Sequence, residues 1–113
     1  MFDARRGQVY AAGYRVGQGI DELFAPRAAA LETVLADLED PGTWLFSGDG
    51  AGAGEEAIRS AGGRIAEPAA WVPRASSLLW LAEVSPELGR VPDPGRWEPG
   101  YVRLPAAQRT VER

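Results

Sequence analysis

The feature that most constrains this sequence is a turn within its first ten residues. Residues 3–7 read D-A-R-R-G, a run of turn formers, and residues 8–16 read Q-V-Y-A-A-G-Y-R-V, which is rich in β-branched and aromatic side chains. This pattern predicts a β-hairpin whose first strand is reduced to Met1 and Phe2. Because two residues cannot pair with nine, we expect the chain to be a piece of a longer protein that begins inside a sheet.

A loop at residues 17–19 and a helix over residues 26–39 are expected next. Pro26 suits the first helical turn, where its missing N–H is not needed. The apolar residues fall at helical spacing and would form one stripe. The stripe consists of Ala28, Leu31, Val34, Leu35 and Leu38. The sequence D-P-G at residues 40–42 ends this helix.

Residues 43–66 predict a β-α-β unit. Residues 43–47 are a short apolar run bounded by turn signals, which is typical of a buried strand, and residues 64–66 return as a second short strand. A glycine-rich loop at residues 48–54 and a helix over about residues 55–61 lie between them. A strand–helix–strand crossover predicts that part of the sheet is parallel.

A third helix, expected over residues 74–85, is apolar on most of its sides. Trp80, Leu81 and Val84 spread apolar surface beyond its main stripe and are candidate interface residues, with burial in the domain's own core as the alternative. From Pro86 onward, repeated prolines exclude long regular structure. We expect residues 106–113 to form a C-terminal tail.

Composition excludes several kinds of active site. The chain has neither cysteine nor histidine, so it has no thiolate nucleophile, no Ser–His site and no thiolate or imidazole metal ligand. A carboxylate site stays open, but the adjacent acidic pairs fall at helix ends or loops, where solvated charge is the default. We therefore expect a non-catalytic chain that binds neither a cofactor nor a metal ion.

Charge and hydropathy limit the kinds of partner and the cellular location that we expect for this chain. The net charge is −4 and the arginines are scattered, so we expect no direct contact with nucleic acid. No stretch approaches the roughly 18 apolar residues of a membrane span, and no secretory signal pattern precedes the hairpin. These observations predict a cytoplasmic protein without a membrane partner.

Gly48, Asp49 and Gly50 are candidate nucleotide-binding residues. Glycines let a backbone approach a phosphate closely, and a following helix N-terminus offers free N–H groups. The run lacks the lysine and hydroxyl residue of a phosphate-binding loop, and Asp49 would repel a phosphate. A plain tight turn is therefore the alternative.

Three segments resemble motifs of the TsaB (YeaZ) family. Residues 3–10 are similar to its D-A-R-x-x-E-V-Y, with Gln8 where the family commonly has Glu; residues 47–51 resemble its strand-ending G-D-G-A, and residues 99–103 its C-terminal P-x-Y-x-R. The match covers nearly the whole chain but only about the C-terminal half of a usual member. The residues that carry it in the first and third motifs are Asp3, Ala4, Arg5, Gly7, Val9, Tyr10, Tyr101 and Arg103.

The resemblance implies both a fold and a role. The family is related to glycoprotease-like proteins and belongs to the actin-like ATPase superfamily, in which Gly48–Gly50 would be a degenerate form of an adenosine-holding turn. Residues 1–105 would be the second lobe of an actin-like (RNase H-like) fold. This lobe would be an α/β domain with an N-terminal hairpin, a β-α-β unit and about three helices, truncated by the loss of the N-terminal lobe.

The role implied is that of a non-catalytic scaffold in the complex that makes threonylcarbamoyladenosine on transfer RNA. Its partners would be a TsaD-type catalytic paralogue and a TsaE-type ATPase. In this family the contact with the catalytic paralogue is expected chiefly in the N-terminal lobe. Two other functions remain open: a degenerate actin-like nucleotide-binding domain, and a small self-associating domain of unrelated role.

The hairpin and the third helix together predict self-association. Residues 9–16 have a strand partner of only two residues, and an unpaired strand edge invites pairing with another chain. The apolar surface around Trp80 also favours burial. We expect a homodimer or larger assembly, unless another part of the same chain, residues 101–104, replaces the short first strand.

Overall fold

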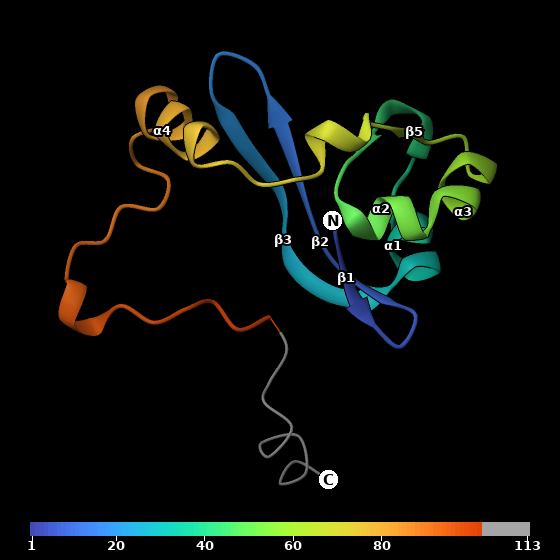
Figure 1. The fold of residues 1–113 in the computed structure, drawn as a ribbon, viewed down its shortest axis with the longest axis horizontal. Helices are drawn as coiled ribbons and strands as arrows, with labels where there is room; N and C mark the ends of the chain where they lie inside the picture. The colour runs from blue at the N-terminus through green and yellow to red at the C-terminus, as the bar shows by residue number, and fades with distance from the viewer. Residues whose placement is uncertain (103–113) are drawn as a thin grey trace, which may run out of the picture.

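The chain begins with a three-stranded antiparallel sheet, coloured blue to cyan in Figure 1. The computed structural model describes residues 1–102. The three strands are β1 (Phe2–Arg5), β2 (Gln8–Val16) and β3 (Ile20–Ala30), which pair in that order. The expected pairing of residues 9–16 within a sheet is therefore confirmed, and so is the loop that follows them.

The turn between β1 and β2 is tighter than the sequence predicts. β1 continues to Arg5, so the strand expected to end at Phe2 is four residues long, and only Arg6 and Gly7 form the turn. Their φ angles of 54° and 72° lie in the left-handed region, which glycine adopts without strain. The Asp3 carboxylate accepts a hydrogen bond from the Arg5 N–H at 2.8 Å and supports the reversal.

Strand β3 takes up the residues expected to begin the helix over residues 26–39. The helix expected over residues 26–39 begins only at Leu31, and the residues before it continue β3. Pro26 lies where the β2–β3 register shifts, between the paired residues Phe24 and Arg27, so the interrupted ladder does not need its missing N–H. The prediction was wrong at these residues because pairing along β2 outweighs helical periodicity.

α1 (Leu31–Asp37) joins the two parts of the hydrophobic core. Leu31, Val34 and Leu35 of the predicted apolar stripe are buried. Val34 packs into one cluster with β2, whereas the other two pack into a second cluster with the β-α-β unit that follows. The partners are Val9 and Ala11 in the first cluster and Phe46, Ala51 and Ile58 in the second.

The predicted β-α-β unit is present, with a different helical part. β4 (Leu45–Phe46) pairs in parallel with β5 (Arg64–Ile65), and a short 3-10 turn at Pro41–Thr43 replaces part of the strand expected over residues 43–47. Two helices connect the strands, α2 (Asp49–Ala53) and α3 (Glu55–Ser60). The glycine-rich loop is thus mostly helix. Tight packing against β1 outweighs the low helix propensity of its glycines.

The two sheets adjoin at the start of the chain. The Met1 amino group donates a hydrogen bond to the Ser47 carbonyl at 2.8 Å, and the Asp3 N–H donates one to the Asp49 carboxylate at 2.9 Å. Because Met1 lies beside Ser47 and Asp3 beside Asp49, β1 runs in the same direction as β4. The result is an α/β domain in which an antiparallel sheet of three strands lies beside a parallel pair.

α4 (Ala75–Val84) confirms the third expected helix and stands apart from α1, α2 and α3 in Figure 1. It has no buried residue. The segment from Pro86 to the end of the described residues has a turn at residues 86–89 and a 3-10 turn at Pro94–Arg96 but no long regular structure, as its prolines predict. The end of the expected lobe and the tail at residues 106–113 lie outside the described residues. Within residues 1–102, none of the helices has the length and apolar character needed to cross a membrane.

Candidate functional site

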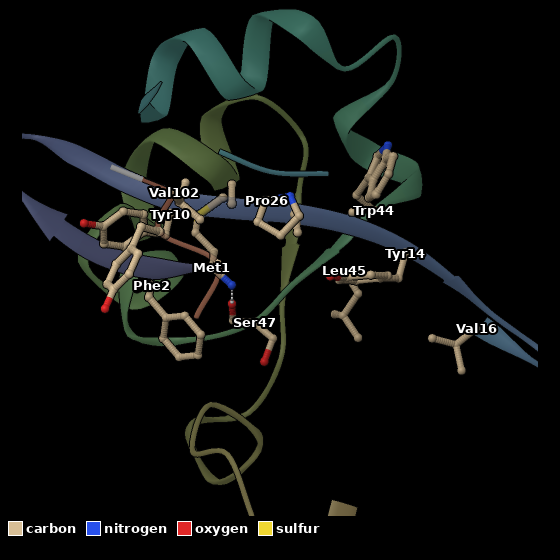
Figure 2. Close-up of a pocket in the computed structure, with 15 residues that line it drawn as sticks. Met1, Phe2, Tyr10, Tyr14, Val16, Pro26, Trp44, Leu45, Ser47 and Val102 are labelled. Carbon is tan, nitrogen blue, oxygen red and sulfur yellow. Dashed lines mark hydrogen bonds between the residues drawn. The ribbon is translucent and has the colours of Figure 1, made fainter. Parts of the chain in front are cut away.

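A cavity of about 720 Å³ opens where the two sheets adjoin, shown in Figure 2. It lies between β2 and the β4 segment, and Met1 lies among the residues that line it. None of the side chains that line it is an Asp, Glu or Arg. Its lining residues are Met1, Phe2, Tyr10, Ala11, Ala12, Gly13, Tyr14, Val16, Pro26, Trp44, Leu45, Ser47, Gly100, Tyr101 and Val102.

The walls of this cavity include two strand edges. β1 pairs only with Gln8–Tyr10, so residues 11–16 of β2 have no strand on the β1 side within the described part of the chain. β4 pairs with β5 on its far side, and its Leu45 side chain remains 61% exposed. Unpaired backbone groups on both walls therefore face a space with apolar surroundings.

The Met1 residue contributes its amino group to the surroundings of the cavity. It is half-buried and donates a hydrogen bond to the Ser47 carbonyl, as the dashed line in Figure 2 shows. Burial lowers its pKa below the ordinary value, and the nearby Asp49 carboxylate opposes part of that shift. This ammonium is the one charged group contributed by the residues that line the cavity.

Gly48, Asp49 and Gly50 lie directly beside β1. Gly48 has a φ of +105°, and a Cβ on it would overlap the Met1 carbonyl oxygen; a Cβ on Gly50 would lie 2.7 Å from the Phe2 carbonyl carbon. Asp49 accepts the backbone hydrogen bond from Asp3. The close backbone approach that these glycines permit is thus made by the chain's own first strand.

The three segments that resemble family motifs meet at this cavity. Tyr10 of the first, Ser47 of the second and Tyr101 of the third all line it. Asp3, Ala4 and Arg5 lie in β1 and Val9 in β2, while Gly7 lies in the turn. Arg103 lies outside the described residues.

The candidate interface residues of α4 are not part of the cavity. Trp80 is 49% exposed, and Leu81 and Val84 are partly buried. The alternative of burying Trp80 in the domain's own core therefore does not describe this structure.

Sequence reasoning missed the wall residues Tyr14, Trp44 and Leu45. Tyr14 and Leu45 are exposed, and the same three residues border a second groove of about 1330 Å³ between β3 and the segment that follows α1. A lone aromatic in a predicted strand has no distinct sequence signal. Their role depends on the distance between two sheets, which the periodicity of either strand does not encode.

The side chains that line the cavity carry no charge. Its polar side-chain groups are the hydroxyl groups of Ser47 and three tyrosines and the indole N–H of Trp44, and no carboxylate pair lines it. Across residues 1–102, no cluster of acidic side chains is arranged to hold a metal ion. Comparisons with protein-family models, curated proteins and solved structures give no match for this chain. The geometry of the fold and of the cavity is therefore the basis for proposing a function.

Proposed function

We propose that this chain is a TsaB-like scaffold lobe that acts, without catalysing a reaction, in the synthesis of threonylcarbamoyladenosine on transfer RNA. The observation that carries the proposal is the convergence of the three family-like segments. They are separated by tens of residues in the sequence, yet Tyr10, Ser47 and Tyr101 line one cavity. The hydrogen bond from Asp3 to Asp49 joins the first two segments directly.

The fold supports the same proposal at a coarser level. An antiparallel meander whose first strand lies beside a β-α-β unit is the arrangement expected for the second lobe of an actin-like domain. The cavity lining offers apolar surface and backbone hydrogen-bonding groups rather than acid–base side chains, which suits a subunit that binds a partner. A TsaD-type paralogue would supply catalysis, and a TsaE-type ATPase would assist.

A reconstituted modification reaction tests this function. The reaction contains TsaD-type and TsaE-type proteins, transfer RNA and the N-terminal lobe of a TsaB-type protein, and this chain is added or left out. We expect threonylcarbamoyladenosine, measured by mass spectrometry of digested transfer RNA, only when both lobes are present. Unchanged yield on adding the chain would contradict the proposal.

A matched pair of variants ties the activity to the joined motifs. Asp49→Ala removes the acceptor of the Asp3 hydrogen bond, whereas Asp93→Ala removes a similar exposed acceptor, that of the Gly95 N–H, far from the cavity. We expect the first variant to lower the yield and the second to leave it unchanged. Equal effects would show that the junction of the motifs does not matter.

A further inference from the structure

The groove of about 1330 Å³ between β3 and the segment that follows α1 combines apolar and acidic side chains. Its aromatic residues include Phe24 and Trp44, whose ring centroids lie 5.7 Å apart. Three exposed carboxylates, those of Asp37, Glu39 and Asp40, also line it. A surface that fits this groove therefore needs apolar side chains with positive charge beside them.

Most of the charge in the groove is not neutralised within the chain. Asp37 pairs with Arg27 at 2.8 Å. Within residues 1–102, no ion pair involves Glu39, Asp40 or Arg15, which are the other charged residues that line the groove. The groove thus presents two free carboxylates and one free guanidinium group.

The register of the β2–β3 ladder gives the spacing of these charges. Arg27, which holds Asp37, is opposite Ala11. Arg15 lies four residues further along β2, which is about 13 Å at roughly 3.3 Å per residue. Arg15 remains without an ion pair even though Asp21 is opposite it in the ladder. The acidic group therefore lies towards one end of the groove and Arg15 towards the other.

α4 carries an exposed apolar stripe, and none of its residues lines the groove of its own chain. The stripe falls at helical spacing and consists of Ala75, Leu78, Leu79 and Ala82, all of them exposed. Its two leucines are 67% and 74% exposed. The partly buried residues Leu81 and Val84 lie on another side of the helix, so the chain's own packing leaves the stripe uncovered.

The charges of α4 match those of the groove in sign and spacing. Arg74 precedes the helix and Glu83 lies near its end, about 14 Å away at roughly 1.5 Å per residue. Both are exposed, and neither has an ion pair within the described residues. No side chain caps the N-terminus of α4, so the N–H groups of its first turn also favour a nearby carboxylate.

We propose that the groove between β3 and residues 37–45 binds α4 of a second copy of this chain. The apolar stripe lies on the aromatic rings, Arg74 lies beside the free carboxylates, and Glu83 lies beside Arg15. Each chain has one groove and one α4, so two chains can exchange their helices and close as a dimer. The inference identifies the surface that receives α4 and is independent of the function proposed above.

Charge reversal tests whether these two surfaces meet. Glu39→Arg and Arg74→Glu should each weaken the dimer about tenfold in sedimentation equilibrium, because each brings like charges together. The chain with both changes should recover most of the lost affinity. Glu56→Arg is the matched control at an exposed glutamate of α3, and it should change the affinity less than about twofold.

A spin label tests the same contact without altering a charge. The chain has no cysteine, so Ala25→Cys places a single nitroxide at an exposed position in the groove. The nitroxide-bearing chain is mixed with an isotope-labelled chain of unaltered sequence, in which NMR detects only the second molecule. We expect the amide signals of residues 75–82 to broaden. A nitroxide at Ala53→Cys, exposed on α2 outside the groove, should broaden them much less.

Four results would overturn the proposal. They are a monomeric unaltered chain, unchanged affinity in Glu39→Arg, no recovery in the double reversal, and no broadening of residues 75–82 in the mixed sample. Broadening seen only when nitroxide and isotope are in the same molecule would assign the groove to the chain's own α4. The spin-label experiment decides the question even where a charge-reversed variant fails to fold.

Discussion

At the scale of single residues, the junction of the two sheets depends on glycines, which have no side chain at the point of contact. Gly48 lies against the Met1 carbonyl, and any side chain there would push β1 away from β4. The sequence marks the glycines clearly but does not say what approaches them. Close approach of a phosphate and close approach of the chain's own backbone both require glycine at these positions. Only the folded structure shows which of the two groups is there.

Gly48→Ala is therefore expected to destabilise the domain by roughly 2–4 kcal/mol, because it combines a positive φ with a steric overlap. The measurement is urea unfolding. Gly62→Ala is the matched control, since Gly62 also has a positive φ of 88° but nothing lies within 4 Å of its added Cβ. It should cost only about 1–2 kcal/mol. Equal losses would show that backbone conformation alone decides the effect.

The Met1 amino group makes stability depend on pH. Its pKa is lower in the folded chain than the ordinary value of 8.0, so the unfolded chain holds this proton to higher pH. The free energy of unfolding should therefore rise as pH increases between the lowered pKa and about pH 8, and level off above it. The chain has no histidine or cysteine, so no side chain with an ordinary pKa titrates in this range.

Thermal unfolding at several pH values between 6 and 9 tests this expectation, with a chain acetylated at Met1 as the control. Acetylation removes the titration, so the rise in melting temperature should disappear. A rise that persists after acetylation would assign the effect to another group.

At the scale of elements, sequence reasoning worked where local pattern and tertiary contacts agree. The hairpin, the parallel β-α-β unit and α4 were predicted because turn residues and apolar runs mark them directly. The β3–α1 boundary was wrong because Ala28 and its neighbours fit a helix as well as a strand, and the long edge of β2 decides between the two. The cavity was not predictable, since it lies between elements whose separation no local pattern sets.

The elements also differ in how much stability they contribute. Ile58 of α3 is fully buried in the core cluster, so Ile58→Ala should cost about 2–5 kcal/mol. Leu79 of α4 is 74% exposed, and Leu79→Ala should change the stability by less than about 0.5 kcal/mol at concentrations below those of self-association. Chemical denaturation of both variants gives the comparison. A large loss at Leu79 would mean that α4 is packed in solution.

At the scale of the whole molecule, α4 leaves a patch of exposed apolar side chains. The patch comprises Leu78, Leu79 and Trp80, and it lies apart from the core clusters. Exposed apolar surface of this kind favours contact with another protein surface. The expectation of self-association therefore remains a proposal, and α4 is its most exposed apolar element.

Sedimentation at micromolar concentration tests it with the Trp80→Glu variant. We expect the unaltered chain to sediment as a dimer or larger species and the variant as a monomer with an unchanged circular dichroism spectrum. Val72→Glu changes an exposed apolar residue outside α4 and should leave the assembly intact. A monomeric unaltered chain would contradict self-association.

The position of Met1 between the two strand edges has a practical consequence for handling the protein. Residues joined ahead of Met1, whether a purification tag, a linker or a fused domain, would be attached to the Met1 nitrogen. They would extend β1 backwards into the space between β2 and β4. They would also turn the Met1 ammonium into a neutral peptide N–H and so remove its titration. A preparation tagged at this end would therefore lack the pH-dependent stability expected of a chain in which the Met1 amine is free.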